Sequence, residues 1–174
     1  MRFFFFFGGA GALVALLYLG FLEFYYYRDR VDWLYPLSTQ SEFLVRRDRW
    51  GKGDFGAKRS GGRRHHGVDI LADEGVRVVA VRAGRARVGE VPKGMGKFIS
   101  ITHREGIRTI YGHLSETFIR DKSRVRQGQL IGAVGKTGNA SAEGVLPHLH
   151  FEMKLGDAVI DPTPILNRTK PKPL

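Results

Sequence analysis

Residues 97–111, KFISITHREGIRTIY, contain a clear β-strand pattern in this 174-residue chain. Two runs in which apolar and polar residues alternate, 97–102 and 107–111, flank a short connection that contains glycine. Alternation with a period of two puts apolar side chains on one face of a strand, and a short connection joins antiparallel strands. The segment therefore predicts a β-hairpin.

Further strand patterns lie on both sides of this hairpin. They occupy residues 77–90, with a break at Gly84, and residues 129–134, 149–155 and 158–160. Strands this short and closely spaced predict an all-β domain built on an antiparallel, sandwich-like sheet. Within it, only residues 115–121 fit a helical turn.

An apolar run at the N-terminus, about residues 3–27, predicts one transmembrane helix before this domain. A helix of about 20 residues crosses roughly 30 Å of hydrocarbon, and a tyrosine cluster followed by arginine is typical of the membrane interface. A cleaved signal peptide is the alternative. We divide the chain into an anchor at residues 1–30, a basic linker at 31–63 with a possible first strand at 43–45, the β domain at 64–166, and a Lys/Pro tail at 167–174.

Composition narrows the range of partners. A formal net charge of +11 favours an anionic partner such as nucleic acid, acidic lipid or a cell-wall polymer. The chain has no recognised nucleic-acid motif, so no nucleic acid is expected. The absence of cysteine excludes disulfides and thiolate metal ligands.

Two distant pairs of residues have the chemistry of a metal site. His65 and Asp69 are four apart, and His148 and His150 are two apart, so on strands each pair would share a face. Zinc binds imidazole nitrogen and carboxylate oxygen, and a catalytic site uses three protein ligands. Four inward groups would leave one histidine free to transfer protons.

Several motifs follow one another in a particular order. They are HHGVDI at residues 65–70, TIYGHLS at 109–115, GQLIG at 128–132 and PHLHFE at 147–152. In this order they resemble the lysostaphin/LytM-type zinc metalloendopeptidases, which cut peptidoglycan cross-bridges. The resemblance covers roughly residues 64–164.

The resemblance implies that His65, Asp69 and His150 hold one Zn²⁺ and that His113 and His148 are the two further active-site histidines. We predict that His148 is the general base and that His113 stabilises the oxyanion or donates a proton. The predicted function is hydrolysis of peptide cross-links in peptidoglycan. The predicted location is the cytoplasmic (inner) membrane, single-pass, with the catalytic domain facing the periplasm.

The alternative function is a non-hydrolytic scaffold or activator of other cell-wall hydrolases, since the family also contains such members. Residues 137–147 are longer than the usual family passage. We expect this segment to wall the substrate groove and to affect which cross-link is accepted. His66 and His103 are expected to lie outside the metal ligand set.

Overall fold

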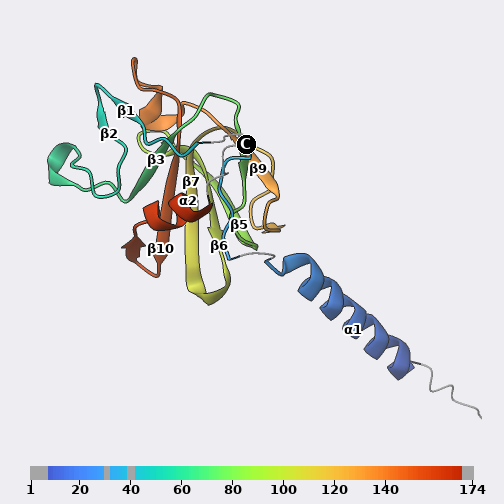
Figure 1. The fold of residues 1–174 in the computed structure, drawn as a ribbon. Coiled ribbons are helices and arrows are strands. Elements are labelled where there is room, and N and C mark those ends of the chain that lie inside the picture. Colours follow the sequence, from blue (N-terminus) through green and yellow to red (C-terminus); the bar gives the residue numbers. More distant parts are fainter. Residues whose placement is uncertain (1–7, 30–31, 39–41, 170–174) are drawn as a thin grey trace, which may run out of the picture.

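The computed structural model describes residues 8–29, 32–38 and 42–169, and most of the regular secondary structure in these ranges is antiparallel β-strand (Figure 1). Two α-helices are present in these ranges, α1 (Gly8–Tyr27) and α2 (Thr163–Thr169). The strands are β1 (Arg47–Asp48), β2 (Gly51–Lys52), β3 (Gly67–Leu71), β4 (Arg77–Val79), β5 (Gly84–Val91), β6 (Gly96–Thr102), β7 (Ile107–Thr117), β8 (Arg124–Val125), β9 (Leu130–Val134), β10 (His148–Leu155) and β11 (Ala158–Ile160). Short 3-10 turns are η1 (Ser60–Gly62), η2 (Arg104–Gly106) and η3 (Gly138–Ser141).

The large sheet has the strand order β11-β10-β7-β6-β5-β8, with β3 also paired to β10. Every pairing in it is antiparallel. β7 is the longest strand and pairs first with β6 and then, past an irregularity, with β9, which also pairs with β4. The prediction of an antiparallel β domain is confirmed.

Strand β10 shows how the sheet separates the core from the polar groups. Leu149, Phe151 and Met153 belong to the hydrophobic core and are almost fully enclosed. Burying side chains of this size contributes about 1.5–3 kcal/mol each. His148 and His150 alternate with them and therefore point to the opposite face of the strand.

Two local predictions differ from the structure. Residues 115–117 continue β7 instead of forming a helical turn, because the end of β7 pairs with β9. A first strand is expected near Phe43–Val45, but there Val45 makes only an isolated bridge to Ile70, and β1 begins at Arg47.

The predicted membrane anchor, and the inner-membrane, periplasm-facing location that depends on it, must be corrected. In the described part of the chain, no helix is both long enough and apolar enough to cross a membrane. Helix α1 begins at Gly8, so residues 3–7 of the predicted span lie outside the described residues. The helix also contains several glycines and tyrosines and Glu23, which favour transfer into hydrocarbon less than leucine does.

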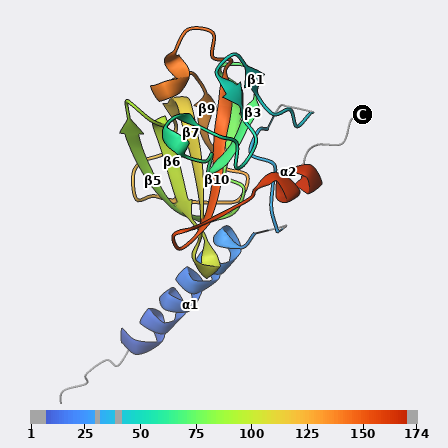
Figure 2. The ribbon, with the colours of Figure 1, turned by 90° about the vertical axis from the view of Figure 1, so that its left-hand side faces the viewer.

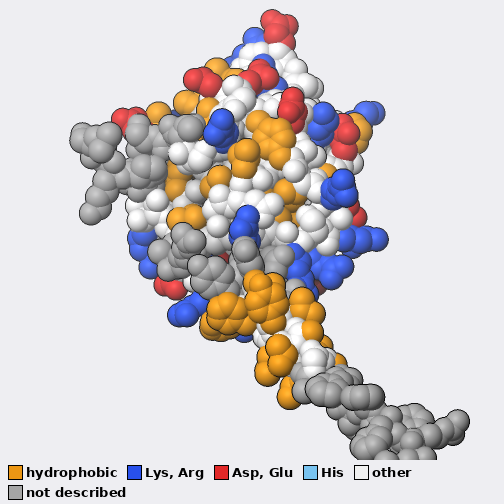
Figure 3. All heavy atoms as spheres, turned by 90° about the vertical axis from the view of Figure 1, so that its right-hand side faces the viewer, with side chains coloured by type: hydrophobic (Ala, Val, Ile, Leu, Met, Phe, Trp, Pro, Cys, Tyr) orange, Lys and Arg blue, Asp and Glu red, His pale blue; other side chains and the backbone are white. Residues whose placement is uncertain are grey.

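Helix α1 extends away from the sheet (Figures 1 and 2). Its apolar side chains are largely exposed, and Figure 3 shows them along the helix where it leaves the sheet. Among the described residues, the core cluster contains none from α1. The packing of the sheet therefore does not depend on this helix.

Gly67 opens β3 and lies opposite Glu152 of β10 in the strand register. A Cβ atom there would collide with the carbonyl oxygen of Phe151 and would lie 3.0 Å from Cε1 of His150. We expect Gly67→Ala to lower the free energy of unfolding by about 2 kcal/mol, because the backbone can yield only by disturbing this strand pairing. Urea denaturation measures the change. Gly20→Ala, with no atom within 4 Å of the new Cβ, is the control, and equal stability of the two variants would contradict the expectation.

Candidate metal centre and catalytic site

Three of the predicted ligands meet where β3 and β10 pair. Asp69 and His150 are opposite each other in the strand register, and His65 reaches them from two residues before β3. Nε2 of His65, Nδ1 of His150 and Oδ1 of Asp69 lie 3.0–3.1 Å from one another. All three residues are buried. This triangle of two imidazole nitrogens and one carboxylate oxygen could hold a metal ion.

Each imidazole of the triangle also has a partner at its other ring nitrogen. Nδ1 of His65 lies 3.0 Å from the carbonyl oxygen of Asp54. Because a carbonyl oxygen can only accept, this nitrogen carries the hydrogen, and Nε2 keeps its lone pair for a metal. Nε2 of His150 lies 3.5 Å from Oε2 of Glu152, which also pairs with Lys154. Such partners orient metal-binding rings and fix their tautomer.

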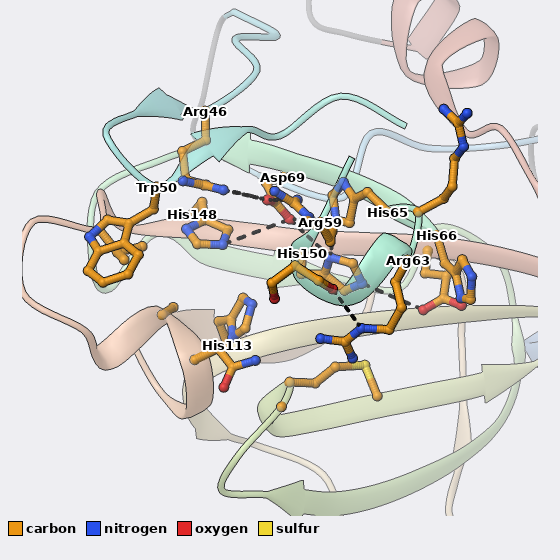
Figure 4. Close-up of a pocket in the computed structure, with 18 residues that line it drawn as sticks. Arg46, Trp50, Arg59, Arg63, His65, His66, Asp69, His113, His148 and His150 are labelled. Carbon is orange, nitrogen blue, oxygen red and sulfur yellow. Dashed lines mark hydrogen bonds and ion pairs between the residues drawn. The ribbon is translucent and has the colours of Figure 1, made fainter. Parts of the chain in front are cut away.

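The imidazoles of His113 and His148 lie beside the triangle (Figure 4). Their ring centroids are 4.8 Å apart, and Nε2 of His148 is 3.8 Å from Oδ1 of Asp69. Nδ1 of His113 is 2.8 Å from the carbonyl oxygen of Thr137, and Nδ1 of His148 is 2.7 Å from that of Leu146. Both Nδ1 atoms therefore donate, and both Nε2 atoms remain available to accept a proton.

Burial and neighbouring groups set the charge of these rings. Burial, reinforced by the nearby imidazoles of His148 and His150, lowers the pKa of His113 to about 3. Burial also lowers the pKa of His148. For His150, burial acts in the same direction, but hydrogen bonds with Asp69 and Glu152 prevail and raise its pKa to about 9. At neutral pH, His113 and His148 are thus neutral proton acceptors.

The backbone at His113 has a φ of 62°, in the left-handed region that residues other than glycine rarely adopt. This conformation follows directly after Gly112, which pairs with His150, and the N–H of His113 donates to the carbonyl oxygen of Met95 at 2.7 Å. It brings the His113 ring to within 5.9 Å of the His150 ring, measured between centroids. A left-handed residue costs about 1–2 kcal/mol. Strain of this kind is concentrated at functional sites.

Two arginines that the sequence analysis did not assign to the site contact the second oxygen of Asp69. Arg46 donates to Oδ2 at 3.0 and 3.3 Å, and Arg59 donates to it at 3.0 Å. Arg46 is buried and pairs as well with Asp48, whose Oδ2 accepts from the N–H of Leu146 at 3.1 Å. The Asp69 carboxylate is therefore held from both sides, with Oδ1 toward the histidines and Oδ2 toward the arginines.

Removing Arg46 would leave the enclosed carboxylate of Asp48 without its ion pair and that of Asp69 with Arg59 as its remaining arginine partner. We expect Arg46→Met to lower the free energy of unfolding by about 3 kcal/mol, the effect of breaking a buried ion pair. The neighbouring Arg47, whose side chain is 58% exposed, pairs with Asp54 at the surface. Arg47→Met is therefore a matched control with an expected loss below about 1 kcal/mol. Chemical denaturation distinguishes the two, and equal losses would show that Arg46 has no special role.

A pocket of about 500 Å³ opens over these groups. Asn139, Ala140 and Val145, from the long segment at 137–147, line it. Trp50, which is 56% exposed, lines it as well, and its Nε1 donates to the carbonyl oxygen of Glu143 at 2.9 Å. The long segment is thus attached to the hairpin of β1 and β2 and forms a wall of the pocket.

Two other histidines lie outside the triangle. His66 is exposed at the pocket, next to His65. His103 is buried elsewhere, where its ring nitrogens lie 2.9 Å from the carbonyl oxygen of Ala83 and 2.8 Å from Oγ1 of Thr109. Its contacts are those of a structural residue.

The antiparallel β domain brings two imidazoles and a carboxylate together, and two more imidazoles lie beside them. These are the features of a mononuclear metallohydrolase. The chain belongs to peptidase family M23, whose family model matches residues 63–162. The resemblance to lysostaphin/LytM-type peptidases is confirmed.

Curated relatives include both enzymes and activators. The DD-carboxypeptidase/endopeptidase Mpg of Neisseria meningitidis is 34% identical over 103 residues, which are 59% of this chain and 23% of Mpg. The murein hydrolase activator EnvC of Escherichia coli is 31% identical over 114 residues, which are 66% of this chain and 26% of EnvC. The chain therefore spans about a quarter of the length of these two relatives.

Solved structures share the fold. The catalytic domain of lysostaphin from Staphylococcus simulans has a TM-score of 0.57 and 29% identity, covering 72% of this chain and 99% of that domain. A zinc-containing peptidase from Vibrio cholerae also has a TM-score of 0.57, with 27% identity, covering 72% of this chain and 37% of the other.

Proposed function

We propose that this chain is a zinc-dependent endopeptidase that hydrolyses peptide cross-links of peptidoglycan. Membership of family M23 supports the proposal, as do the names of two relatives, the DD-carboxypeptidase/endopeptidase Mpg and the peptidase lysostaphin. The observation that carries it is the ligand triangle of His65, Asp69 and His150 with two proton-accepting imidazoles next to it. The proposed catalytic unit is residues 64–166, to which the preceding segment adds part of the pocket wall.

In this proposal, the ion is held by Nε2 of His65, Oδ1 of Asp69 and Nδ1 of His150. Tetrahedral zinc with bonds of 2.0–2.1 Å places its ligand atoms about 3.3 Å apart, close to the 3.0–3.1 Å found here. Nitrogen and carboxylate ligands in this number are those of catalytic zinc, and a zinc-containing peptidase is among the similar structures. When bound, zinc supplies the Lewis-acid chemistry that amide hydrolysis needs at neutral pH.

His148 is proposed to take a proton at Nε2 and to return it to the amine that leaves. It suits this role because it is neutral and its Nε2 lies 3.8 Å from Oδ1 of Asp69, at the edge of the triangle. The hydrogen bond from Nδ1 to the carbonyl oxygen of Leu146 keeps Nε2 directed toward the reacting groups.

His113 is proposed to stabilise negative charge on the oxygen of the scissile carbonyl. Its Nδ1 hydrogen is engaged by Thr137, so Nε2 can donate only when the ring is protonated. Burial disfavours that form at rest. A negative charge that develops nearby favours the protonated ring of His113. The ring would therefore stabilise the transition state more than the bound substrate.

Activation of a separate cell-wall hydrolase is the second candidate function, because EnvC is a murein hydrolase activator. Docking to a partner enzyme requires neither a buried ligand triangle nor a left-handed backbone at His113. Both features cost folding stability, and a catalytic role would account for their presence. Hydrolysis therefore fits the site better.

Release of soluble muropeptides from purified peptidoglycan tests the proposal. The zinc-loaded chain is compared with its His148→Ala variant, and the products are identified by mass spectrometry. We expect cross-link products from the parent only. A folded, zinc-loaded parent that releases nothing alone but accelerates an added wall hydrolase would refute the endopeptidase and establish the activator.

A further inference from the structure

The pocket contains more positive than negative charge. Four arginines line it, but its only carboxylates are Asp69 and Glu152. Asp69 is already paired with Arg46 and Arg59, and Glu152 with Lys154. In the described ranges, no carboxylate lies within ion-pairing distance of Arg63 or Arg64, the other two arginines.

Arg63 is the arginine whose side chain is available to a ligand. It is exposed and lines the pocket, and Figure 4 shows it on the side of the site away from Trp50. Its Nε donates to the carbonyl oxygen of Ser60 at 3.3 Å, and no hydrogen bond engages its two terminal nitrogens within the described residues. Arg64 is less available, because it donates to the carbonyl oxygen of Gly56 at 3.1 Å.

The turn that carries Arg63 is fixed relative to the ligand triangle. Gly61 and Gly62, both with positive φ, form the tight η1 turn, and the N–H of Arg59 donates to the carbonyl oxygen of Arg63 at 2.9 Å. The side chain of Arg59 in turn contacts Asp69. A group bound by Arg63 would therefore be held in a defined position relative to the metal ligands.

We infer that Arg63 forms a subsite for a free carboxylate of the peptide substrate. The terminal nitrogens of a guanidinium bind both oxygens of a carboxylate in parallel, which fixes direction as well as charge. The substrate class is therefore a cross-linked stem peptide with an ionised carboxylate near the scissile bond, in preference to a neutral bridge such as oligoglycine. This inference rests on the proposed endopeptidase function.

The subsite is tested with two synthetic cross-linked peptides that differ in one group only. One peptide carries a carboxylate and the other carries a carboxamide of the same size at that position. For the parent chain, we expect kcat/KM to be about tenfold higher with the carboxylate, the effect of one charge-assisted pair. In Arg63→Gln, we expect the ratio of kcat/KM between the carboxylate and the carboxamide peptide to fall to about one. Arg63→Lys keeps the charge and should retain part of the preference. Added salt should reduce the preference of the parent, because the pair is exposed.

Arg85→Gln is the matched control, because Arg85 is an exposed arginine on β5 that does not line the pocket. It should keep the full preference of the parent. Equal cleavage of both peptides by the parent, or a preference that survives in Arg63→Gln, would overturn the subsite alone. Cleavage of neither peptide would overturn the endopeptidase function and the subsite with it.

Discussion

Replacing His150 with alanine is expected to abolish zinc binding and peptidoglycan hydrolysis together. Nδ1 of His150 lies 3.0 Å from both other ligand atoms of the triangle, so its removal leaves only His65 and Asp69. Substitution of outer-shell partners already lowers metal affinity about 10–100-fold, and loss of a direct ligand should exceed that. The zinc content after dialysis and the zinc affinity by competition titration measure the first effect, and muropeptide release measures the second.

The histidine next to His65 supplies the control for this experiment. His66 is exposed and is not part of the triangle. His66→Ala should therefore bind zinc with the affinity of the parent. If His150→Ala kept one tightly bound zinc per chain, or if His66→Ala lost it, the ligand assignment would be wrong.

Replacing His148 with alanine is expected to separate metal binding from turnover. Proton transfer by a positioned side chain contributes about 10²–10⁴-fold to a reaction rate, so kcat should fall by a factor in this range. Zinc affinity should stay within a few-fold of the parent, because His148 lies outside the triangle. A variant that lost zinc as completely as His150→Ala would make His148 a ligand instead of a base.

Two substitutions of His113 separate the effect of its imidazole on turnover from the effect of its left-handed backbone on stability. His113→Ala and His113→Gly both remove the imidazole and should slow turnover to a similar extent. Because φ is 62° at this position, glycine should be the more stable of the two by about 1 kcal/mol. Equal stability of the two variants would mean that the backbone relaxes out of the left-handed region.

Much of the fold was predictable because its signals are local. Two hairpins, that of β6 and β7 and that of β10 and β11, follow from the alternation of apolar and polar residues and from short connections. Both signals depend only on neighbouring residues. The helical turn expected at 115–121 failed for the opposite reason. Pairing of the end of β7 with β9 is a long-range interaction that the local pattern does not contain.

The candidate site was predictable only in part. His65, Asp69, His113, His148 and His150 could be named because their motifs occur in a recognisable order. Arg46 and Arg59 could not, because residues 46–64 contain many arginines and the sequence does not indicate which of them meet Asp69. The left-handed backbone at His113 is likewise visible only in three dimensions.

The two imidazoles beside the triangle are oriented by main-chain carbonyls, those of Thr137 and Leu146. Every residue type provides such a carbonyl, so a point mutation at Leu146 changes the side chain but leaves the acceptor of His148 in place. The wall segment can therefore accumulate mutations that reshape the pocket while the rings of His113 and His148 keep their orientation. During evolution, mutations in this segment could change which substrates the pocket accepts without at the same time disturbing these two rings. Laboratory libraries that vary residues 139–146, except Gly144 with its φ of 77°, should for this reason contain a higher fraction of active members than libraries that vary residues of the sheet core.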